Sequence, residues 1–392
     1  SLEIVQYNAK NGFAYAVSGV KGVLIAVDLN DKLDGDEVVS LTGKEYDVKS
    51  MVSSYGDMTS VAISPDGTRL AVAIQAEDYT ANGVVAVFTC GTDGSLTLSG
   101  TVSVGVQPDM VTFTPDGSKI LTANEGEPRM GYTAEGAVDP AGSVSIIDAK
   151  TFEAKTVGFG DFDSDSARQA LVKKGIVLKK NTDPSVDLEP EYIACDNATA
   201  YVTCQEANAI AVLDLSSGAF TGIYSVGFED YSKVAIDIDK KDEEYAPKTY
   251  ESLRGIRMPD GISLYEVGGA TYLITANEGD ARAWPVDDET DTNEIKDKES
   301  PVNKLKPGGK VTWFDASQYD GLESGTDYLF GARSFTVLKV TENGLEEVFD
   351  SGSDFEKITA EKLGKYFNCS NDNIEMEDRS GKKGPEPESV TT

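Results

Sequence analysis

Two similar acidic strings each follow an apolar run of this chain. The first acidic string, residues 124–127 (NEGE), follows KILTA, and the second acidic string, residues 277–280 (NEGD), follows YLITA. Carboxylate and amide oxygens are the ligands that hard divalent cations prefer, and Ca²⁺ takes six to eight of them. The strings therefore predict a divalent metal site, with Ca²⁺ as the expected ion.

Other acids stand beside prolines where further apolar runs begin, as in Pro108-Asp109, Pro190-Glu191 and Pro259-Asp260. Carboxylates crowded at one place repel one another, and protonation or a bound cation relieves that repulsion. Asp109 and Glu189 are expected at the same rim as the metal ligands. The predicted metal ligands are Glu125, Glu127, Glu191, Glu206, Glu278, Asp280, Glu386 and Glu388.

An arginine follows each acidic string at the same offset, Arg129 in the first case and Arg282 in the second. Each guanidinium either neutralises the neighbouring acids or binds an anion such as phosphate. The expected ligand-binding residues are Asn124, Arg129, Asp260, Asn277 and Arg282. A structural interpretation stays open, because Asn, Asp and Gly favour turns and an acid beside an arginine often forms a weak surface ion pair.

The elements that must position these residues are strands in a repeat. Each copy runs from a proline-acid pair through a strand, a polar turn such as SPDG (64–67) or TPDG (114–117), and a second strand that ends in the acidic string. Third strands are expected at 22–29, 83–90, 142–149 and 209–215, while 309–316 and 333–340 compete for that place in the fifth copy. Units of about four strands predict an all-β fold, a β-propeller of four-stranded blades. In a blade the start of the first strand and the end of the second meet beside the central channel, so the acids should converge on one rim.

About five blades are expected within residues 1–392, which we interpret as a single domain because no linker divides the chain. Insertions are expected near 128–140, 158–186, 228–256, 283–307 and 353–383.

Composition excludes several classes of function. A net charge of −32 argues against nucleic acid as a partner, and no apolar run approaches the ~20 residues of a membrane span. The absence of histidine removes catalysis through a histidine base and histidine-ligated zinc. Cys195 and Cys204 fall on one predicted hairpin, where either a disulfide or two small buried apolar side chains would fit.

Several stretches together resemble the bacterial choice-of-anchor I family: LTANEGEPR, EPEYIA, TYLITANEGDAR, RSFTVLKV and GPEPES. The resemblance covers nearly the whole chain. It implies a secreted or cell-surface protein whose full-length relatives have seven blades, so this chain would stop as a sixth blade begins. Ser389 replaces the glycine that is usual in the last motif.

Two functions follow as expectations. In the first, a surface-displayed propeller with an acidic metal-binding rim acts as a binding or surface-layer-type module, with a small anionic ligand or a cell-surface component as partner. In the second, suggested by relatives labelled alkaline phosphatase-like and by phytase-like propellers, the metal activates water and an arginine steadies phosphoryl oxygens in a metal-dependent phosphoesterase.

Overall fold

The protein is described by a computed structural model that covers residues 4–30, 41, 43–128, 138–241, 244–285, 294–296, 305 and 311–392. Most of the stretches expected as insertions near 128–140 and 283–307 lie outside these residues.

Within the described residues, five four-stranded antiparallel sheets form the body of the molecule. The first contains β1 (Val5–Asn8), β2 (Phe13–Ser18), β3 (Val23–Asp28) and β4 (Gly43–Asp47). The second contains β5 (Asp57–Ile63), β6 (Arg69–Gln75), β7 (Asn82–Cys90) and β8 (Leu96–Val106). The third contains β9 (Pro108–Phe113), β10 (Lys119–Asn124), β11 (Ser143–Asp148) and β12 (Ala154–Gly158). The fourth contains β14 (Ile193–Cys195), β15 (Thr199–Cys204), β16 (Ala209–Asp214) and β17 (Ala219–Ser225). The fifth contains β20 (Ile262–Val267), β21 (Ala270–Ala276), β26 (Phe335–Thr341) and β27 (Gly344–Asp350).

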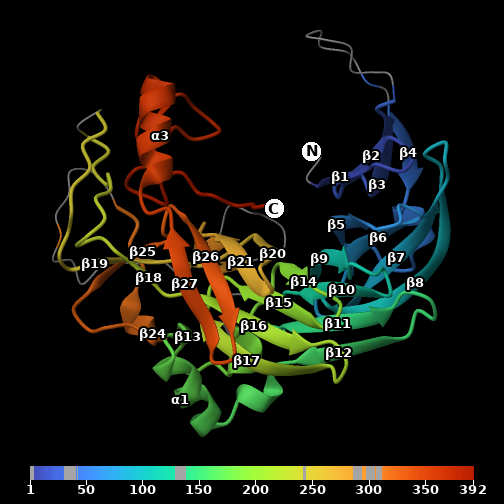
Figure 1. The fold of residues 1–392 in the computed structure, drawn as a ribbon, viewed down its shortest axis with the longest axis horizontal. Helices are drawn as coiled ribbons and strands as arrows, with labels where there is room; N and C mark the ends of the chain where they lie inside the picture. The colour runs from blue at the N-terminus through green and yellow to red at the C-terminus, as the bar shows by residue number, and fades with distance from the viewer. Residues whose placement is uncertain are drawn as a thin grey trace.

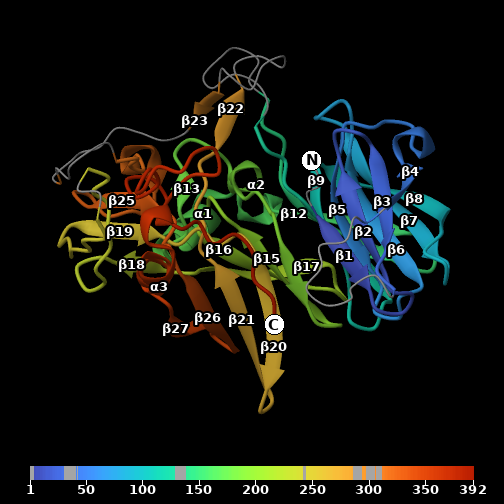
Figure 2. The ribbon, with the colours of Figure 1, turned by 90° about the horizontal axis from the view of Figure 1, so that it is seen from above.

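The strands of each sheet follow chain order from one edge to the other, which is the arrangement of a propeller blade. The first strands of consecutive sheets contact one another, β1 with β5, β5 with β9, β9 with β14 and β14 with β20. Successive sheets follow one another along a curve, with the first and fifth at its two ends (Figure 1). Figure 2 places these two sheets on opposite sides of the molecule. The predicted all-β propeller fold is confirmed, and Phe335–Thr341, not the 309–316 stretch, is the third strand of the fifth sheet.

Turn chemistry explains the hairpins that the sequence predicts. Gly67 and Gly117 have positive φ, and each donates its N–H to the carbonyl of the residue three positions earlier. The Asp66 carboxylate accepts a hydrogen bond from the Ser64 hydroxyl, and the Asp116 carboxylate accepts one from the Thr114 hydroxyl. These local hydrogen bonds support the turns, and side chains from elsewhere in the chain add to them, since Asn8 donates to the Gly67 carbonyl and Arg69 donates to the Gly117 carbonyl.

The core lies between adjacent sheets. On β6, Leu70, Val72 and Ile74 pack into the cluster that includes the first sheet, whereas Ala71 and Ala73 pack into the cluster that includes the third. This alternation follows from the period of two along a strand, because successive side chains point to opposite faces.

Smaller elements connect the sheets. Between the third and fourth sheets lie η2 (Gly160–Phe162), α1 (Asp165–Lys173), β13 (Leu178–Lys179) and α2 (Pro184–Asp187). Before and within the fifth sheet lie β18 (Phe228–Asp230), β19 (Leu253–Ile256), β22 (Ala283–Pro285), β23 (Glu294–Lys296), η4 (Ala316–Gln318), β24 (Tyr319–Asp320) and β25 (Asp327–Phe330). The remaining helices are η1 (Lys49–Met51), α3 (Asp354–Leu363) and η5 (Gly364–Tyr366).

Cys195 and Cys204 are free thiols. Cys195 lies opposite Ala200 in the hairpin, and Cys204 lies opposite Ala209 in the next pair of strands, so the register does not bring the two sulfur atoms face to face. The disulfide alternative is therefore wrong. Burial raises the pKa of both thiols, as expected of small apolar side chains in a core.

Candidate functional site

The predicted acids lie at the same end of the first two strands in the third, fourth and fifth sheets. Asp109 opens β9, the first acidic string follows β10, Glu191 precedes β14, Glu206 follows β15, Asp260 precedes β20, and the second acidic string follows β21. We call this set the acidic mouth. Its members are Asp109, Glu125, Glu127, Glu189, Glu191, Glu206, Asp260, Glu278, Asp280, Glu386 and Glu388.

Electrostatic effects between these groups show that the fold brings several of them together. Burial raises the pKa of Glu125 well above its usual value, and Glu127, Asp109, Glu206 and Glu189 raise it further, in that order. Burial likewise raises the pKa of Glu191, with Glu206 and Asp260 as the largest charged contributors. Carboxylates from separate sheets therefore share one poorly solvated region.

Glu206 and Asp260 are buried members of the acidic mouth. Burial raises the pKa of Glu206 to about 7, although Arg282 opposes that shift. Burial raises the pKa of Asp260 to about 8, and Glu278 and Glu388 add to the effect. Both side chains are less than a tenth exposed, and Oε2 of Glu206 is buried without a hydrogen-bond partner. An unsatisfied carboxylate oxygen at this depth is energetically costly and suits a bound proton or cation.

The asparagine of each acidic string is part of the scaffold. The Asn124 side chain is fully buried, donates to the Ser143 and Ser145 hydroxyls, and accepts a hydrogen bond from Thr122. These bonds tie the end of the second strand to the third strand of the same sheet.

Asn277 repeats this pattern at the end of β21. Its amide donates to the Ser334 hydroxyl at 2.9 Å and the Thr336 hydroxyl at 2.8 Å, and its oxygen accepts from Thr275. Because both amides are engaged within the sheets, neither Asn124 nor Asn277 is placed to contact a ligand in this conformation. These hydrogen bonds give both asparagines a structural role, and their assignment as ligand-binding residues stays a prediction.

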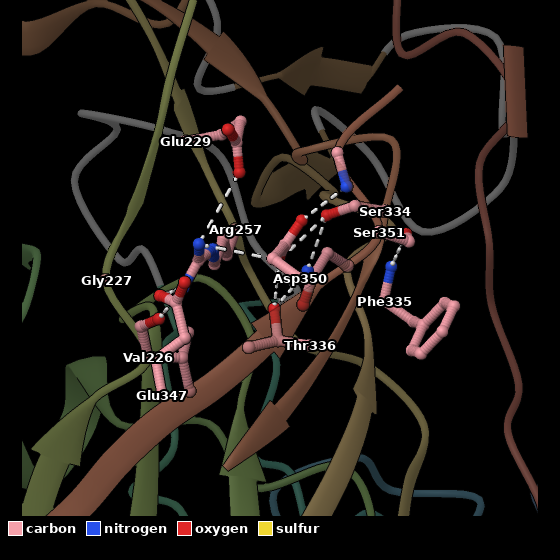
Figure 3. A network of polar contacts seen from close by, with 12 residues as sticks. Val226, Gly227, Glu229, Arg257, Ser334, Phe335, Thr336, Glu347, Asp350 and Ser351 are labelled. Carbon is pink, nitrogen blue, oxygen red and sulfur yellow. Dashed lines mark hydrogen bonds and ion pairs between the residues drawn. The ribbon is translucent and has the colours of Figure 1, made fainter. Parts of the chain in front are cut away.

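The network around Asn277 continues to a buried arginine (Figure 3). Ser334 and Thr336 both donate to Oδ2 of Asp350, and Arg257 lies 3.4 Å from the same oxygen. Arg257 also pairs with Glu347 at 2.6 Å. The second acidic string is thus held on a buried polar network that links β21, β26 and β27.

The glycine of each acidic string is also structural. Gly126 and Gly279 have φ values of 72° and 83°, which residues other than glycine rarely adopt. A Cβ atom on Gly279 would lie 2.0 Å from the Gly331 nitrogen, and one on Gly126 would lie 2.9 Å from the Pro140 carbonyl oxygen. The asparagine and the glycine of each acidic string therefore have structural roles. These roles do not account for the acids of the two strings.

The first acidic string faces a glutamate pair from the next sheet. We call Glu125, Glu127, Glu189 and Glu191 the first acidic cluster. Arg282 binds Glu189 at 3.1 Å and Asp187 at 3.0 Å, and all three side chains are almost fully buried.

The second acidic string has an equivalent pair in the C-terminal segment. We call Glu278, Asp280, Glu386 and Glu388 the second acidic cluster. Here Arg379 binds Glu386 through two nitrogens, Nε at 2.8 Å and one terminal nitrogen. Lys383 adds a second cation, because its Nζ lies 2.9 Å from Asp280, 3.4 Å from Glu386 and 3.7 Å from Glu278.

The same tripeptide, Glu-Pro-Glu, supplies the partner of each acidic string, at 189–191 and at 386–388. Gln107, Met258 and Glu386, each followed by proline and an acid, have φ values of 51°, 47° and 45°. The backbone conformation at residues 386–388 therefore resembles the conformation that leads into β9 and the one that leads into the strand after Pro259.

A cavity of about 500 Å³ adjoins the second acidic cluster. Its charged lining includes Glu278, Glu386, Glu388, Asp372 and Arg379, and its apolar lining includes Leu363 and Tyr366 from the α3 and η5 region.

The acidic mouth is not a preformed chelate. Within the described ranges, no group of three or more carboxylate or cysteine side chains is arranged to hold a metal ion. The oxygen donors suit a hard cation in kind, but Arg282, Arg379 and Lys383 already compensate part of the negative charge.

The two predicted arginines differ in what can be said of them. Arg129 lies outside the described residues. Arg282 is 4% exposed and donates to the Asp187 carbonyl as well as to the two carboxylates, so it neutralises acids and does not present a free fork to an anion.

Sequence reasoning missed Lys383 and Arg379. The signal that could have found them is the basic pair KK (382–383) shortly before the second Glu-Pro-Glu. No lysine pair stands directly before the first Glu-Pro-Glu.

Comparisons with known proteins address the family and the fold. The model of the choice-of-anchor I domain matches residues 3–392. A search of curated proteins finds no match. Within the described residues, no helix is both long and apolar enough to cross a membrane.

Solved structures with similar folds are distant in sequence. Hydrazine synthase of Kuenenia stuttgartiensis is 11% identical, with a TM-score of 0.41, over 88% of this chain and 64% of that one. A chain of a mitotic checkpoint complex is 9% identical, with a TM-score of 0.43, over 89% and 64%. A protein from Lactobacillus plantarum is 15% identical, with a TM-score of 0.40, over 75% and 70%.

This chain thus spans just under two thirds of the first two proteins, and scores this low say nothing about function. The family match, in contrast, extends over nearly the whole chain. The chain belongs to the choice-of-anchor I family, and it is a surface-associated β-propeller.

Proposed function

We propose that the acidic mouth binds a divalent cation, with Ca²⁺ as the expected ion, and that the propeller acts as an extracellular binding module. The observation that carries this proposal is the buried, unpartnered Oε2 of Glu206 among carboxylates from three consecutive sheets. Burial favours the protonated acid even though Arg282 opposes this effect at Glu206, and a cation that replaces the protons would satisfy the same oxygens.

The first acidic cluster and Glu206 are the proposed ligands. The carboxylate that contributes most to the raised pKa of Glu191 is Glu206, and Glu206 also raises the pKa of Glu125. Rotation of flexible glutamate side chains around Glu206 would supply several carboxylate oxygens to one ion, and water or backbone carbonyls complete a Ca²⁺ shell. Extracellular modules bind Ca²⁺ with dissociation constants of about 10⁻⁴–10⁻³ M. An affinity this weak can be reached even by a site whose side chains must rearrange on binding.

A bound cation would also define the partner. An ion held by carboxylates of the acidic mouth would keep open coordination positions, and a carboxylate or phosphate of a small anionic ligand or a cell-surface component could occupy them. The phosphoesterase alternative has less support, because Arg282 is engaged by Asp187 and Glu189 and is not placed to steady a phosphoryl group.

Calorimetric titration of chelator-treated protein with CaCl₂ tests the proposal. We expect saturable binding by the natural protein and at least a tenfold weaker affinity in Glu206→Gln, which removes one ligand charge. Glu346→Gln is the matched control, because Glu346 is exposed on β27, far along the chain from the mouth. Absence of Ca²⁺ binding, or equal affinity in the two variants, would contradict the proposal.

The same preparations separate the binding module from an enzyme. The natural protein with Ca²⁺, Mg²⁺ or Mn²⁺ is expected to leave a generic phosphate monoester intact. Metal-dependent turnover that Glu125→Gln and Glu278→Gln abolish would instead favour the phosphoesterase.

A further inference from the structure

Lys383 is a cation held inside the second acidic cluster. Its Nζ lies within 4 Å of three carboxylates, those of Asp280, Glu386 and Glu278, which come from two separate segments of the chain. The side chain is only 20% exposed, so this ammonium is shielded from water more than an ordinary surface lysine.

The segment that carries Lys383 is itself fixed. The fully buried Arg333 donates to the carbonyls of Ser380 and Lys382 and pairs with Glu356 of α3. Gly384 has a φ of 71° and packs against the Arg333 side chain. The ammonium of Lys383 is therefore presented at a defined place and is not a mobile surface charge.

Among the residues that the structure describes, the first acidic cluster has the same parts apart from the lysine. Each cluster joins an acidic string to a Glu-Pro-Glu tripeptide, and an arginine binds the first glutamate of each tripeptide. Burial raises the pKa of Glu278 and Lys383 opposes that shift, whereas the charged groups that chiefly act on Glu125 are all acids that raise its pKa further.

We infer that Lys383 is a tethered cation that fills the second of two repeat-related cation positions, so that the chain takes one divalent ion at the first cluster and none at the second. The inference rests on the proposed function and extends it to the number of ions bound. Loss of the ammonium would leave Glu278 and Asp280 without that partner, and a divalent ion would take its place, as a cation relieves crowded carboxylates elsewhere.

Calcium stoichiometry in four proteins tests the inference: the natural protein, Glu206→Gln, Lys383→Gln and the double variant. Counting only sites with the affinity of the natural protein's site, we expect one, none, two and one ions respectively, measured by calorimetry after circular dichroism has shown that each protein is folded. Lys382→Gln is the control for loss of a neighbouring lysine and is expected to bind one ion. Lys383→Arg keeps the positive charge and is expected to bind one ion. This variant tests the inference if Lys383→Gln does not fold.

The outcomes separate the inference from the proposed function. One ion in both the natural protein and folded Lys383→Gln overturns the inference and leaves the proposed function intact. No ion in any protein overturns the proposed function. No ion in the natural protein but one in Lys383→Gln supports the role of Lys383 and overturns the Glu206 site. Two ions in the natural protein or in Lys383→Arg overturn the inference.

Discussion

The two acidic clusters are built from the same sequence elements and differ in how their charge is compensated. In both, a buried asparagine ties the second strand to the third, a glycine with positive φ turns the chain, and an arginine binds the first glutamate of Glu-Pro-Glu. In the second cluster Lys383 then binds both acids of the string, whereas carboxylates dominate the surroundings of Glu125 in the first.

This difference shows that one local motif can serve two purposes. Backbone geometry and the asparagine network are common to both copies because they build the blade. The charge state of the acids depends on a segment that arrives from another part of the chain, residues 379–388 in one case and residues 187–191 in the other. The repeat supplies carboxylates, and distant segments decide whether those carboxylates need a cation.

The largest expected effect compares the two arginines. Arg282→Met should lower the free energy of unfolding by about 3–5 kcal/mol, because it leaves the buried Asp187 and Glu189 carboxylates uncompensated. Arg379→Met should lower it by only about 1 kcal/mol, because the Arg379–Glu386 pair is partly solvated. Urea unfolding measures both, and equal losses would show that the two pairs are equivalent after all.

The glycines come next. Gly279→Ala should destabilise the protein by about 3 kcal/mol, since it combines a left-handed φ with a backbone clash at Gly331. Gly126→Ala should cost less, about 1–2 kcal/mol, because its nearest atom is farther away. The thermal midpoints of the two variants check the order, and the reverse order would contradict the described packing.

The asparagines should behave alike. Asn124→Ala and Asn277→Ala each remove one acceptor and two donors from buried hydroxyl partners, which corresponds to about 2 kcal/mol of unfolding free energy. Denaturant unfolding of the two variants should give values within about 1 kcal/mol of each other. A loss confined to one variant would mean that the scaffold is not shared.

Stability should also depend on pH. Burial raises the folded-state pKa of Glu206 to about 7 and that of Asp260 to about 8, so between pH 4.5 and 8 the folded state binds more protons than the unfolded state. Stability in chelator should therefore fall as pH rises through this window, by up to about 1.4 kcal/mol per pH unit for each proton.

Two variants isolate this contribution from the general repulsion of a chain with a net charge of −32. Glu206→Gln should flatten the slope of thermal midpoint against pH, whereas Glu346→Gln, which removes an exposed charge, should leave it unchanged. Equal slopes in the two variants would assign the effect to overall charge.

Much of the acidic mouth could be read from the sequence. The position of acids at strand ends in a four-stranded repeat sufficed to predict that Glu125, Glu191 and Glu206 would approach one another, because blade topology fixes where those ends meet. The roles of Asn124, Asn277 and Arg282 could not be read in the same way, since an amide or guanidinium beside an acid fits a ligand or a scaffold equally well until its partners are known.

The sequence by itself determined the strands, the turns, the repeat and the end of each blade at which carboxylates gather, because these depend on local hydrogen bonding and on the period of two along a strand. Only the tertiary structure decided which carboxylates are compensated. The partners of Glu189 and Asp280, Arg282 and Lys383, lie 93 and 103 residues away along the chain. Electrostatic interactions act through space between groups that the fold brings within a few ångströms, and no local pattern records that distance.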